Sequence, residues 1–335
     1  MTARRIVIAL PHEVCARLLT PQARARLETC GDVVVCPAEG DLTDPRASAA
    51  LAGADVLLSG WGTTTRGRPL LGLAPELGAL IHSAGTVRPL VDESVFVRGV
   101  AISSQADNNA RPVAEYTLAM ILLAGKGVFE SQRVYRERRA AVDQQALLAG
   151  RGNHGLRVGI IGASRIGRRV LGLLAPFDVE PLLHDPYADE REAASLGARL
   201  VSLDELMASC AVVSLHAPLL AATRGMITAR HLALLPDGAT FINTARGALV
   251  DQDALVGELA AGRIDAVLDV TDPEVVDVAS PLWQLPNVVL TPHVAGSAGN
   301  EISRLGEGAV AEVERFVNGR PLAHPVGRDQ FDAMA

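Results

Sequence analysis

The stretch Leu156-Arg-Val-Gly-Ile-Ile-Gly-Ala-Ser-Arg-Ile-Gly-Arg-Arg-Val-Leu-Gly172 decides the fold. Its apolar run, residues 158–161, predicts a strand buried on both faces, and a helix is expected from about Arg165. Gly162 permits the tight turn between them, and Gly167 lets the helix pack closely against the strand. This order is typical of a dinucleotide-binding site, in which a pyrophosphate rests on the helix N-terminus.

Two further residues bear on the dinucleotide. Ser164 replaces the middle glycine of the fingerprint and adds bulk where backbone would approach the phosphates, although its hydroxyl is able to donate a hydrogen bond instead. Asp185 follows the predicted strand 179–184, 23 residues beyond Gly162, where an acid would accept from ribose hydroxyls and repel a 2′-phosphate. The sequence therefore favours NAD over NADP. The alternative is an ordinary strand–helix turn and a turn-forming Asp-Pro.

The composition restricts the class of protein. A chain of 335 residues suggests two domains, and 49% apolar with only 3% aromatic residues implies cores of Ala, Val, Leu and Ile. Such cores suit parallel sheets covered by helices. The net charge is −7, and the Arg-rich run 133–139 is a mixed helix face that contains Glu137, so no nucleic-acid partner is expected.

The cysteines and the N-terminus bear on location. Cys15, Cys30, Cys36 and Cys210 lack metal-ligand spacing, so we expect buried thiols and no metal. The N-terminal segment is too short for a signal peptide, and no apolar run reaches 18 residues. We expect a cytoplasmic protein without a membrane partner.

Strand and helix patterns alternate along the whole chain, which predicts an α/β protein with parallel, doubly wound sheets. Strands are expected at 6–10, 33–36, 55–59, 80–83, 100–103, 158–161, 179–184, 212–216, 241–244, 266–270 and 288–290. Helices are expected at 21–28, 44–51, 113–124, 203–209, 251–261 and 301–318. Only the second half carries the glycine fingerprint, so the halves form separate domains. We expect a substrate-binding lid domain of residues 1–108 and 300–335, and a nucleotide-binding Rossmann domain of residues 109–299.

The apolar helix 113–124 is expected to cross between the domains, with Pro112 in its first turn and residues 109–111 leading in. A more polar helical arm should follow over 129–149. Together they predict a homodimer interface. The tail 319–335 reads as loose.

Polar residues follow four predicted strands of the second half: His216, Arg246, the acidic segment 269–274, and His293. The carboxyl ends of parallel strands share one edge, where ligands bind in such sheets. Arg grips a carboxylate through two donors, His is a general acid near neutral pH, and a Glu beside it stabilises the imidazolium. Taken alone, each of these residues has another interpretation, that of a hydrogen-bonded polar group without a function. Pro292-His293 alone is also consistent with a simple turn.

The motifs around these residues are similar to those of the D-isomer-specific 2-hydroxyacid dehydrogenases, which include glycerate, phosphoglycerate, formate and phosphite dehydrogenases. The matching segments are Asn109-Ala110 with Val113-Ala114-Glu115, Leu215 to Leu219, Asn243 to Gly247, Leu268 to Glu274 and Leu290 to Gly296. The resemblance implies a Rossmann domain with NAD and a flavodoxin-like substrate domain, joined by crossover helices.

The resemblance also assigns roles. It implies that Arg246, Glu274 and His293 are catalytic, with Asp272 a competitor of Glu274. It places the cofactor on Gly162, Ser164, Arg165, Ile166, Gly167, Asp185, His216, Ala217, Pro218, Thr223, Thr244, Ala245, Asp269 and Gly296. It places the substrate on Trp61, Ala84, Gly85, Thr86 and Asn109, and Arg88 is a further candidate from the same loop.

The substrate loop departs from the family pattern. The family has Gly-Ala-Gly-x-Asp-Asn, and this chain has Ser83-Ala-Gly-Thr-Val-Arg88. We hypothesise that Arg88 recognises a second anionic group of the substrate. The alternative is a surface arginine braced by Asp92 or Glu93.

The resemblance implies reduction of a small 2-keto acid by NADH to the (R)-2-hydroxy acid. Two alternatives remain open at this stage. One is a non-catalytic, NAD-sensing binding protein of the corepressor type, which also occurs in the family. The other is a dehydrogenase for another small acid, such as formate or phosphite.

Overall fold

A computed structural model describes residues 4–332, and the chain folds into two compact units. Unit 1 consists of Met1–Asn109 and Ser297–Ala335, and unit 2 of Ala110–Gly296. The boundaries expected from the sequence, after residues 108 and 299, lie one and three residues from these.

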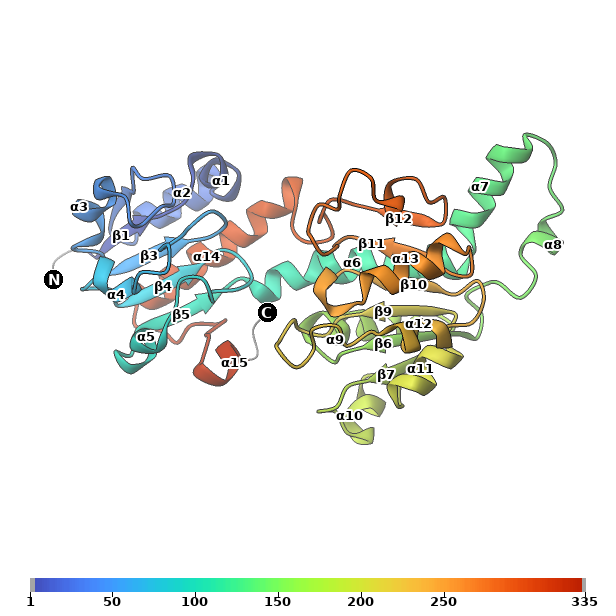
Figure 1. The fold of residues 1–335 in the computed structure, drawn as a ribbon. Helices are drawn as coiled ribbons and strands as arrows, with labels where there is room; N and C mark the ends of the chain where they lie inside the picture. The colour runs from blue at the N-terminus through green and yellow to red at the C-terminus, as the bar shows by residue number, and fades with distance from the viewer. Residues whose placement is uncertain (1–3, 333–335) are drawn as a thin grey trace. The chain divides into compact units, whose positions relative to one another are not determined.

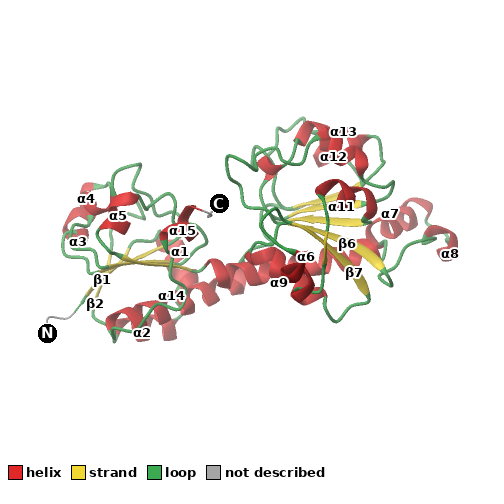
Figure 2. Ribbon diagram, turned by 90° about the horizontal axis from the view of Figure 1, so that it is seen from below, coloured by secondary structure: helices red, strands yellow, loops and turns green. Residues whose placement is uncertain are grey.

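Unit 1 contains a five-stranded parallel sheet in the order β2-β1-β3-β4-β5, which is the flavodoxin-like order (Figure 1). Its strands are β1 Arg5–Ile8, β2 Asp32–Val35, β3 Val56–Ser59, β4 Ala79–His82 and β5 Ala101–Ser104. One face packs on α1 (His12–Leu18), α2 (Pro21–Glu28) and α14 (Ile302–Val317), and the other on α3 (Ser48–Leu51), α4 (Leu70–Leu73) and α5 (Glu93–Val97) (Figure 2).

Unit 2 contains a seven-stranded parallel sheet in the order β12-β11-β10-β9-β6-β7-β8, which is the Rossmann order with an added strand. Its strands are β6 Leu156–Ile161, β7 Val179–His184, β8 Arg199–Leu200, β9 Val212–Leu215, β10 Thr240–Asn243, β11 Asp265–Leu268 and β12 Val288–Leu290. Its helices include α9 Arg165–Leu174, α10 Glu190–Ser195, α11 Leu203–Ser209, α12 Ala229–Leu234 and α13 Gln252–Ala260. The predicted fold class is confirmed.

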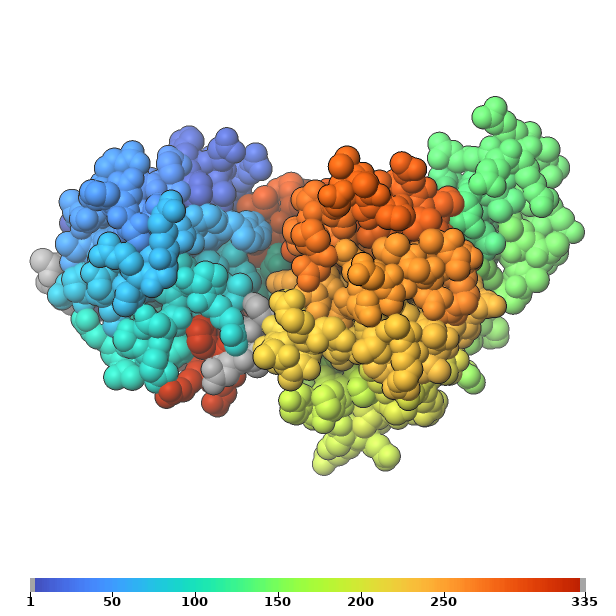
Figure 3. Space-filling view, viewed as in Figure 1, coloured from blue at the N-terminus to red at the C-terminus, as the bar shows by residue number. Residues whose placement is uncertain are grey.

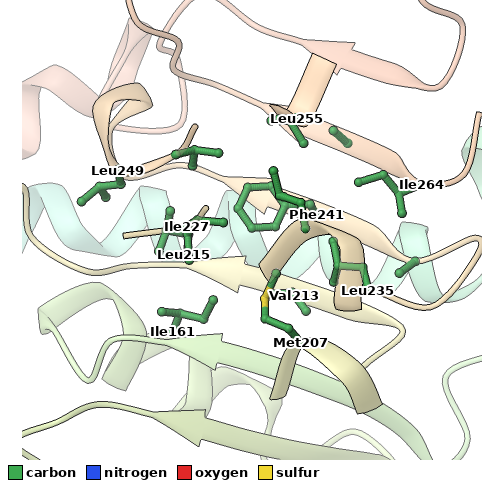
Figure 4. Close-up of a cluster of buried hydrophobic side chains, with 14 of the residues drawn as sticks. Ile161, Met207, Val213, Leu215, Ile227, Leu235, Phe241, Leu249, Leu255 and Ile264 are labelled. Atoms are coloured by element: carbon green, nitrogen blue, oxygen red, sulfur yellow. The ribbon is translucent and has the colours of Figure 1, made fainter. Parts of the chain in front are cut away.

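Small aliphatic residues build both cores, as the composition predicts. The central strands β3, β4, β9 and β10 are buried at every position. Phe241 is the largest fully buried side chain of the described chain, and it lies among Val213, Leu235 and Leu255 (Figure 4). Because parallel strands are covered on both faces, their apolar runs are continuous rather than alternating.

The crossover helix is longer than the sequence predicts. α6 spans Ala106–Gly125, so Pro112 lies inside it rather than in its first turn. The first turn forms upstream of the proline because Asn109 N donates to Gln105 O, at 2.9 Å, and Asn108 Nδ2 donates to Gln105 Oε1, at 2.6 Å. These bonds outweigh the bias of a pre-proline residue against helix.

The arm that follows α6 consists of two short helices rather than one. Gly127, at φ +67°, separates α6 from α7 (Val128–Arg138), and Arg139, at φ +48°, ends α7 before α8 (Gln144–Leu147). The left-handed Arg139 therefore interrupts the continuous helix that was expected over 129–149. α7 and α8 stand away from the sheet of unit 2 (Figures 1 and 3).

The C-terminal tail is held rather than loose, at least as far as residue 332. Glu312 of α14 is buried, and its carboxylate accepts from Ser103 Oγ (2.8 Å) and from the backbone N–H groups of Ala323 (2.9 Å) and His324 (3.1 Å). Val326 N then donates to Ile102 O, at 2.8 Å, along the edge of β5. The segment ends in α15 (Arg328–Asp332), and residues 333–335 lie outside the described part.

Within residues 4–332, no single helix has the length and apolar composition needed to cross a membrane. α6 and α7 meet these criteria only as a pair, and the pair is bent by 55° at the break between them. The same described residues contain no group of three or more His, Cys, Asp or Glu side chains that could hold a metal ion. The four cysteines are free thiols.

Candidate active site

The turn between β6 and α9 is built as the fingerprint predicts. Gly162 has φ +99°, and a Cβ there would lie 2.7 Å from Ala217 N. A Cβ at Gly167 would lie 2.0 Å from Gly162 O, so only glycine permits this packing. Ile166 packs on the apolar cluster under the turn, and Arg165 begins α9. The first-turn amides of α9 therefore stand at the carboxyl edge of the sheet.

Ser164 fits the turn without strain. Its φ is −66°, a value open to any residue, and its Oγ accepts from Gly167 N at 3.3 Å as the N-cap of α9. A capping hydroxyl accepts through a lone pair and keeps its proton, so it is still able to donate to a phosphate. Ser164, which stands where the fingerprint has a glycine, therefore acts as the N-cap of α9.

Asp185 stands directly after β7, where the sequence predicts the ribose-binding acid. One carboxylate oxygen accepts from Ala163 N at 2.7 Å, and the other from Tyr187 N at 2.8 Å. The carboxylate therefore braces the glycine turn. With two oxygens and about four acceptor positions, it retains capacity for ribose hydroxyls.

His216 follows β9 and is fully buried beside the turn. Its Nε2 lies 2.9 Å from Ser214 Oγ, and burial lowers its pKa to about 3, so the ring is neutral. Its Nδ1 is buried and finds no partner within residues 4–332. Next to it, Thr223 Oγ1 donates to Pro218 O at 2.6 Å and fixes the loop that begins with the buried Ala217.

These features fit the dinucleotide that the fingerprint implies. A glycine turn admits close approach, a helix N-terminus offers amides, an acid stands at the ribose position, and one buried imidazole nitrogen is unsatisfied. At the end of β10, Thr244 Oγ1 lies 3.1 Å from Thr117 Oγ1 and Ala245 is buried.

Glu274 and His293 meet in unit 2. His293 Nδ1 lies 2.5 Å from Glu274 Oε1, and their side chains are 46% and 58% exposed. The carboxylate holds the Nδ1 side of the ring, which leaves Nε2 as the nitrogen able to exchange a proton with another molecule. Asp272, the competitor for this role, instead lies 3.6 Å from Arg224.

His293 is held in an unusual backbone conformation by Asp269. Its φ is +55°, which is uncommon outside glycine and costs free energy. The buried Asp269 carboxylate accepts from Thr291 Oγ1 (2.6 Å), Val294 N (2.8 Å) and Ala295 N (2.9 Å), and Asp269 O accepts from His293 N (3.0 Å). Three acceptor positions of the carboxylate are thus used within the protein. Gly296 follows this loop and ends unit 2.

Arg246 lies after β10 on a segment that Asn243 fixes. Asn243 Oδ1 accepts from Ala245 N and its Nδ2 donates to Arg246 O, both at 3.0 Å, while Arg246 Nη1 donates to Ala245 O at 2.6 Å. The guanidinium retains further donors in its planar fork.

The candidates of unit 1 gather at the carboxyl ends of β3 and β4. Ala84 is buried, Gly85 and Thr86 are partly exposed, and Trp61, which follows β3, is 39% exposed. Asn109 lies in α6, and its Oδ1 accepts from Ser297 N at 2.9 Å. That bond gives Asn109 a structural partner in addition to the substrate contact predicted for it.

Arg88 lies against the C-terminal helix. Its Cζ is 5.4 Å from the centroid of the Phe331 ring, and Phe331 packs edge-on against Phe96 at 5.3 Å. Glu93, one of the two acids proposed to brace Arg88, forms an ion pair with Arg328. The other, Asp92, accepts from Ser94 N at the start of α5.

Three residues that support the site were not predicted from the sequence. Two of them, Asn243 and Thr291, stand inside the family motifs, which therefore contained a signal for them. Gln252, which hydrogen-bonds to the Glu274 loop, lies on α13, about 20 residues from the bonds it makes, and no local pattern marks it.

Comparison with known proteins agrees with this geometry. Residues 118–295 match the model of the D-isomer specific 2-hydroxyacid dehydrogenase NAD binding domain. The D-3-phosphoglycerate dehydrogenase of Mycobacterium leprae is 33% identical over 84% of this chain and 52% of its own length. The glyoxylate reductase of Korarchaeum cryptofilum is 32% identical over 73% of this chain and 75% of its own. The chain belongs to the D-isomer specific 2-hydroxyacid dehydrogenase family.

A solved structure agrees over both units. The crystal structure of D-lactate dehydrogenase from Aquifex aeolicus, complexed with NAD and lactic acid, matches with a TM-score of 0.71 and 26% identity, over 94% of this chain and 95% of that one. Together with the family model, this structure confirms that the domain inferred from the glycine fingerprint is the NAD-binding domain of a D-isomer specific 2-hydroxyacid dehydrogenase. The chain spans about half the length of the phosphoglycerate dehydrogenases that it matches, between 43% and 58%.

Proposed function

We propose that this protein is an NAD-dependent D-2-hydroxyacid dehydrogenase that reduces a small 2-keto acid to the (R)-2-hydroxy acid. The observation that carries the proposal is the Glu274–His293 pair, with 2.5 Å between Oε1 and Nδ1, at the same sheet edge as Arg246 and the glycine turn. Family membership and the glyoxylate reductase and D-lactate dehydrogenase relatives support it.

The roles of the side chains follow from their chemistry. Arg246 grips the substrate carboxylate through its planar fork and polarises the keto oxygen. His293, protonated and held at Nδ1 by Glu274, donates its Nε2 proton to that oxygen. Gly85 and Thr86 offer backbone amides to the carboxylate. Bound NADH supplies the hydride.

The cofactor is held by the residues of the turn and of the loops beside it. The first-turn amides of α9 and the Ser164 hydroxyl bind the pyrophosphate, and Asp185 accepts from the ribose hydroxyls. His216, Ala217, Pro218 and Thr223 line the next strand end, and Thr244, Ala245 and Asp269 the two beyond it. The free acceptor position of Asp269 faces the nicotinamide amide in this proposal.

The experiment is steady-state oxidation of NADH with a panel of 2-keto acids that includes glyoxylate, pyruvate and hydroxypyruvate. We expect turnover of at least one acid, with the (R) configuration in the product. NADH binding without turnover of any acid would favour the alternative of an NAD-sensing binding protein. NAD⁺ reduction with formate or phosphite alone would favour the other alternative.

We also propose that the protein is a cytoplasmic homodimer with no nucleic-acid or membrane partner. α6 and α7 form the interface in this proposal, because they expose Leu123, Val128 and Tyr135. The free cysteines accord with a reducing compartment. Light scattering at micromolar concentration should give twice the chain mass, and a monomer would contradict the proposal.

A further inference from the structure

The loop that carries Glu274 has little regular structure of its own. Glu274 lies between the end of β11 and the short 3-10 helix Pro281–Trp283. In this loop Val275 and Val278 are largely exposed, and Val276 is buried in the core of unit 2. A carboxylate on such a loop has many positions open to it. Its bond to His293 therefore requires that something else fix the loop.

Gln252, the first residue of α13, binds the backbone N–H and the backbone C=O of one residue of this loop, Asp272. Its Nε2 donates to Asp272 O at 2.8 Å, and its Oε1 accepts from Asp272 N at 2.9 Å. The side-chain amide thus pairs with the backbone as a neighbouring strand would. We call these two bonds the Gln252 clamp.

The clamp is anchored to a rigid element. Asp251 caps α13 by accepting from Ala254 N at 3.1 Å, and Leu255 and Leu259 of the same helix are buried in the core of unit 2. The clamp therefore ties the Glu274 loop to the core of unit 2 through one neutral side chain.

Thr271 carries the restraint from the clamp to Glu274. Its single Oγ1 proton is shared between Pro273 O at 2.8 Å and Glu274 O at 3.0 Å. On the other side, a Cβ at Gly247 would lie 2.0 Å from the Thr271 carbonyl carbon, so the loop rests directly on the residue after Arg246. The contacts thus run from α13 through Gln252 to the backbone of Asp272, and from there along the loop through Glu274 to His293.

We propose that Gln252 is a positioning residue that sets the protonation of His293 by fixing the Glu274 carboxylate against its ring. This inference rests on the proposed function for its meaning in catalysis, but its geometry lies wholly within unit 2. Glu274 stabilises the charged imidazolium only while it remains at hydrogen-bond distance. Without the clamp the carboxylate spends less time there, and His293 loses its proton at lower pH.

The other charged groups near the pair are not altered when Gln252 is replaced. Asp272 lies beside Arg224, and both are more than half exposed. Asp269 is occupied by Thr291 and the backbone of the His293 loop. Arg246, Asp251 and Asp277 are further charged groups on the segments that follow β10 and β11. Gln252 is neutral, so replacing it removes no charge, and any change in titration must come from geometry.

The experiment is an NMR titration of the His293 imidazole in the full chain, assigned with the variant His293→Asn. Gln252→Met keeps the length of the side chain and removes both bonds. We expect it to lower the titration midpoint by about half a pH unit, and Glu274→Gln to lower it by about one. The double variant should titrate like Glu274→Gln alone, since both changes act through one contact.

Matched variants separate the clamp from general damage. Gln284→Met makes the same change at an exposed position after the loop and should leave the midpoint unaltered. Asp272→Asn keeps the backbone groups that Gln252 binds and should also leave it nearly unaltered. If Gln252→Met folds poorly, Thr271→Val removes the second part of the same path and should lower the midpoint in the same direction.

The outcomes distinguish the inference from the proposed function. A midpoint unchanged in a folded Gln252→Met, or effects that add fully in the double variant, would overturn the inference even if keto acids are reduced. A midpoint unchanged in Glu274→Gln would remove the pairing on which the proposed mechanism depends. The same shifts in the alkaline limb of kcat/KM on glyoxylate, with the Kd for NADH constant, would connect the clamp to catalysis.

Discussion

The two sheets end in histidines that have opposite properties. In unit 1, His82 closes β4, is buried, and places Nδ1 2.9 Å from Ser59 Oγ; burial lowers its pKa to about 4. In unit 2, His293 follows β12, is half exposed, and places Nδ1 against a carboxylate. The first ring is a neutral part of the core, and the second has a carboxylate partner and an exposed side from which to exchange a proton with another molecule.

The difference teaches that a strand-end histidine is not a functional signal by itself. His216, which the sequence placed among the polar strand ends, is like His82 buried, neutral and close to a serine hydroxyl, and it differs in having a buried Nδ1 without a partner within residues 4–332. His293 differs from these two histidines in its exposure and in its carboxylate partner, and these two properties mark it as a candidate for proton transfer. Four expected outcomes test this contrast between the sheet edges of units 1 and 2.

The largest expected effect is that of His293→Ala. We expect kcat for keto-acid reduction to fall roughly 10²–10⁴-fold, the usual contribution of a general acid, with little change in the Kd for NADH. His154→Ala is a matched control, because His154 is also paired with an acid, Asp178, but lies on the surface. A fall of less than tenfold in His293→Ala would place the proton donor elsewhere.

Arg88→Ala tests whether unit 1 also selects the substrate. If Arg88 recognises a second anionic group, kcat/KM on a dianionic keto acid should lose about 1.5–3 kcal/mol, the contribution of a hydrogen bond to a charged group. A monoanionic acid of equal length should lose little, and added salt should weaken the preference. Arg98→Ala, at another exposed arginine of unit 1, serves as the control. Equal losses on both acids would show that Arg88 does not select.

The buried histidine of unit 1 predicts a pH dependence of stability. The unfolded chain protonates His82 near pH 6.5 and the folded chain only near 4, so this stability is present above about 6.5 and is lost as pH falls toward 4. Unit 1 should therefore unfold more easily at pH 5 than at pH 7, by about 2 kcal/mol from this residue. Urea unfolding in a Trp283→Phe background, where Trp61 reports on unit 1 alone, measures it. His82→Gln should flatten the dependence, and an equal slope in both proteins would contradict the prediction.

The smallest expected effect concerns the other end of the unit 2 edge. Asp185→Ala should weaken NADH binding about tenfold and narrow the preference for NADH over NADPH, since an acceptor for the ribose and a brace of the turn are both removed. Fluorescence titration with each cofactor measures the change. Equal use of NADH and NADPH by the unaltered protein would show that Asp185 does not exclude the 2′-phosphate.

Regular structure could be predicted from the sequence where a local pattern determines it. The apolar runs located the strands, because a buried parallel strand is apolar along its whole length, and β7 and β12 match to the residue. The start of α6 and the tail were wrong, because Gln105 and the buried Glu312 hold them through contacts that no local pattern contains. The same limit applies to the site. His293, Glu274 and Arg246 stand in recognisable motifs. The Gln252 clamp, in contrast, depends on the backbone of Asp272, which lies 20 residues from Gln252 in the sequence.

The cap that Ser164 places on α9 has a consequence for the entropy of cofactor capture. A glycine at this position would leave the turn free to sample many backbone conformations until a ligand selected one. The Ser164–Gly167 bond and the Asp185–Ala163 bond order the turn in advance. A preorganised turn loses little conformational freedom when the cofactor binds. Ser164 therefore adds bulk where the phosphates approach, but it also holds the turn in the conformation that binds them.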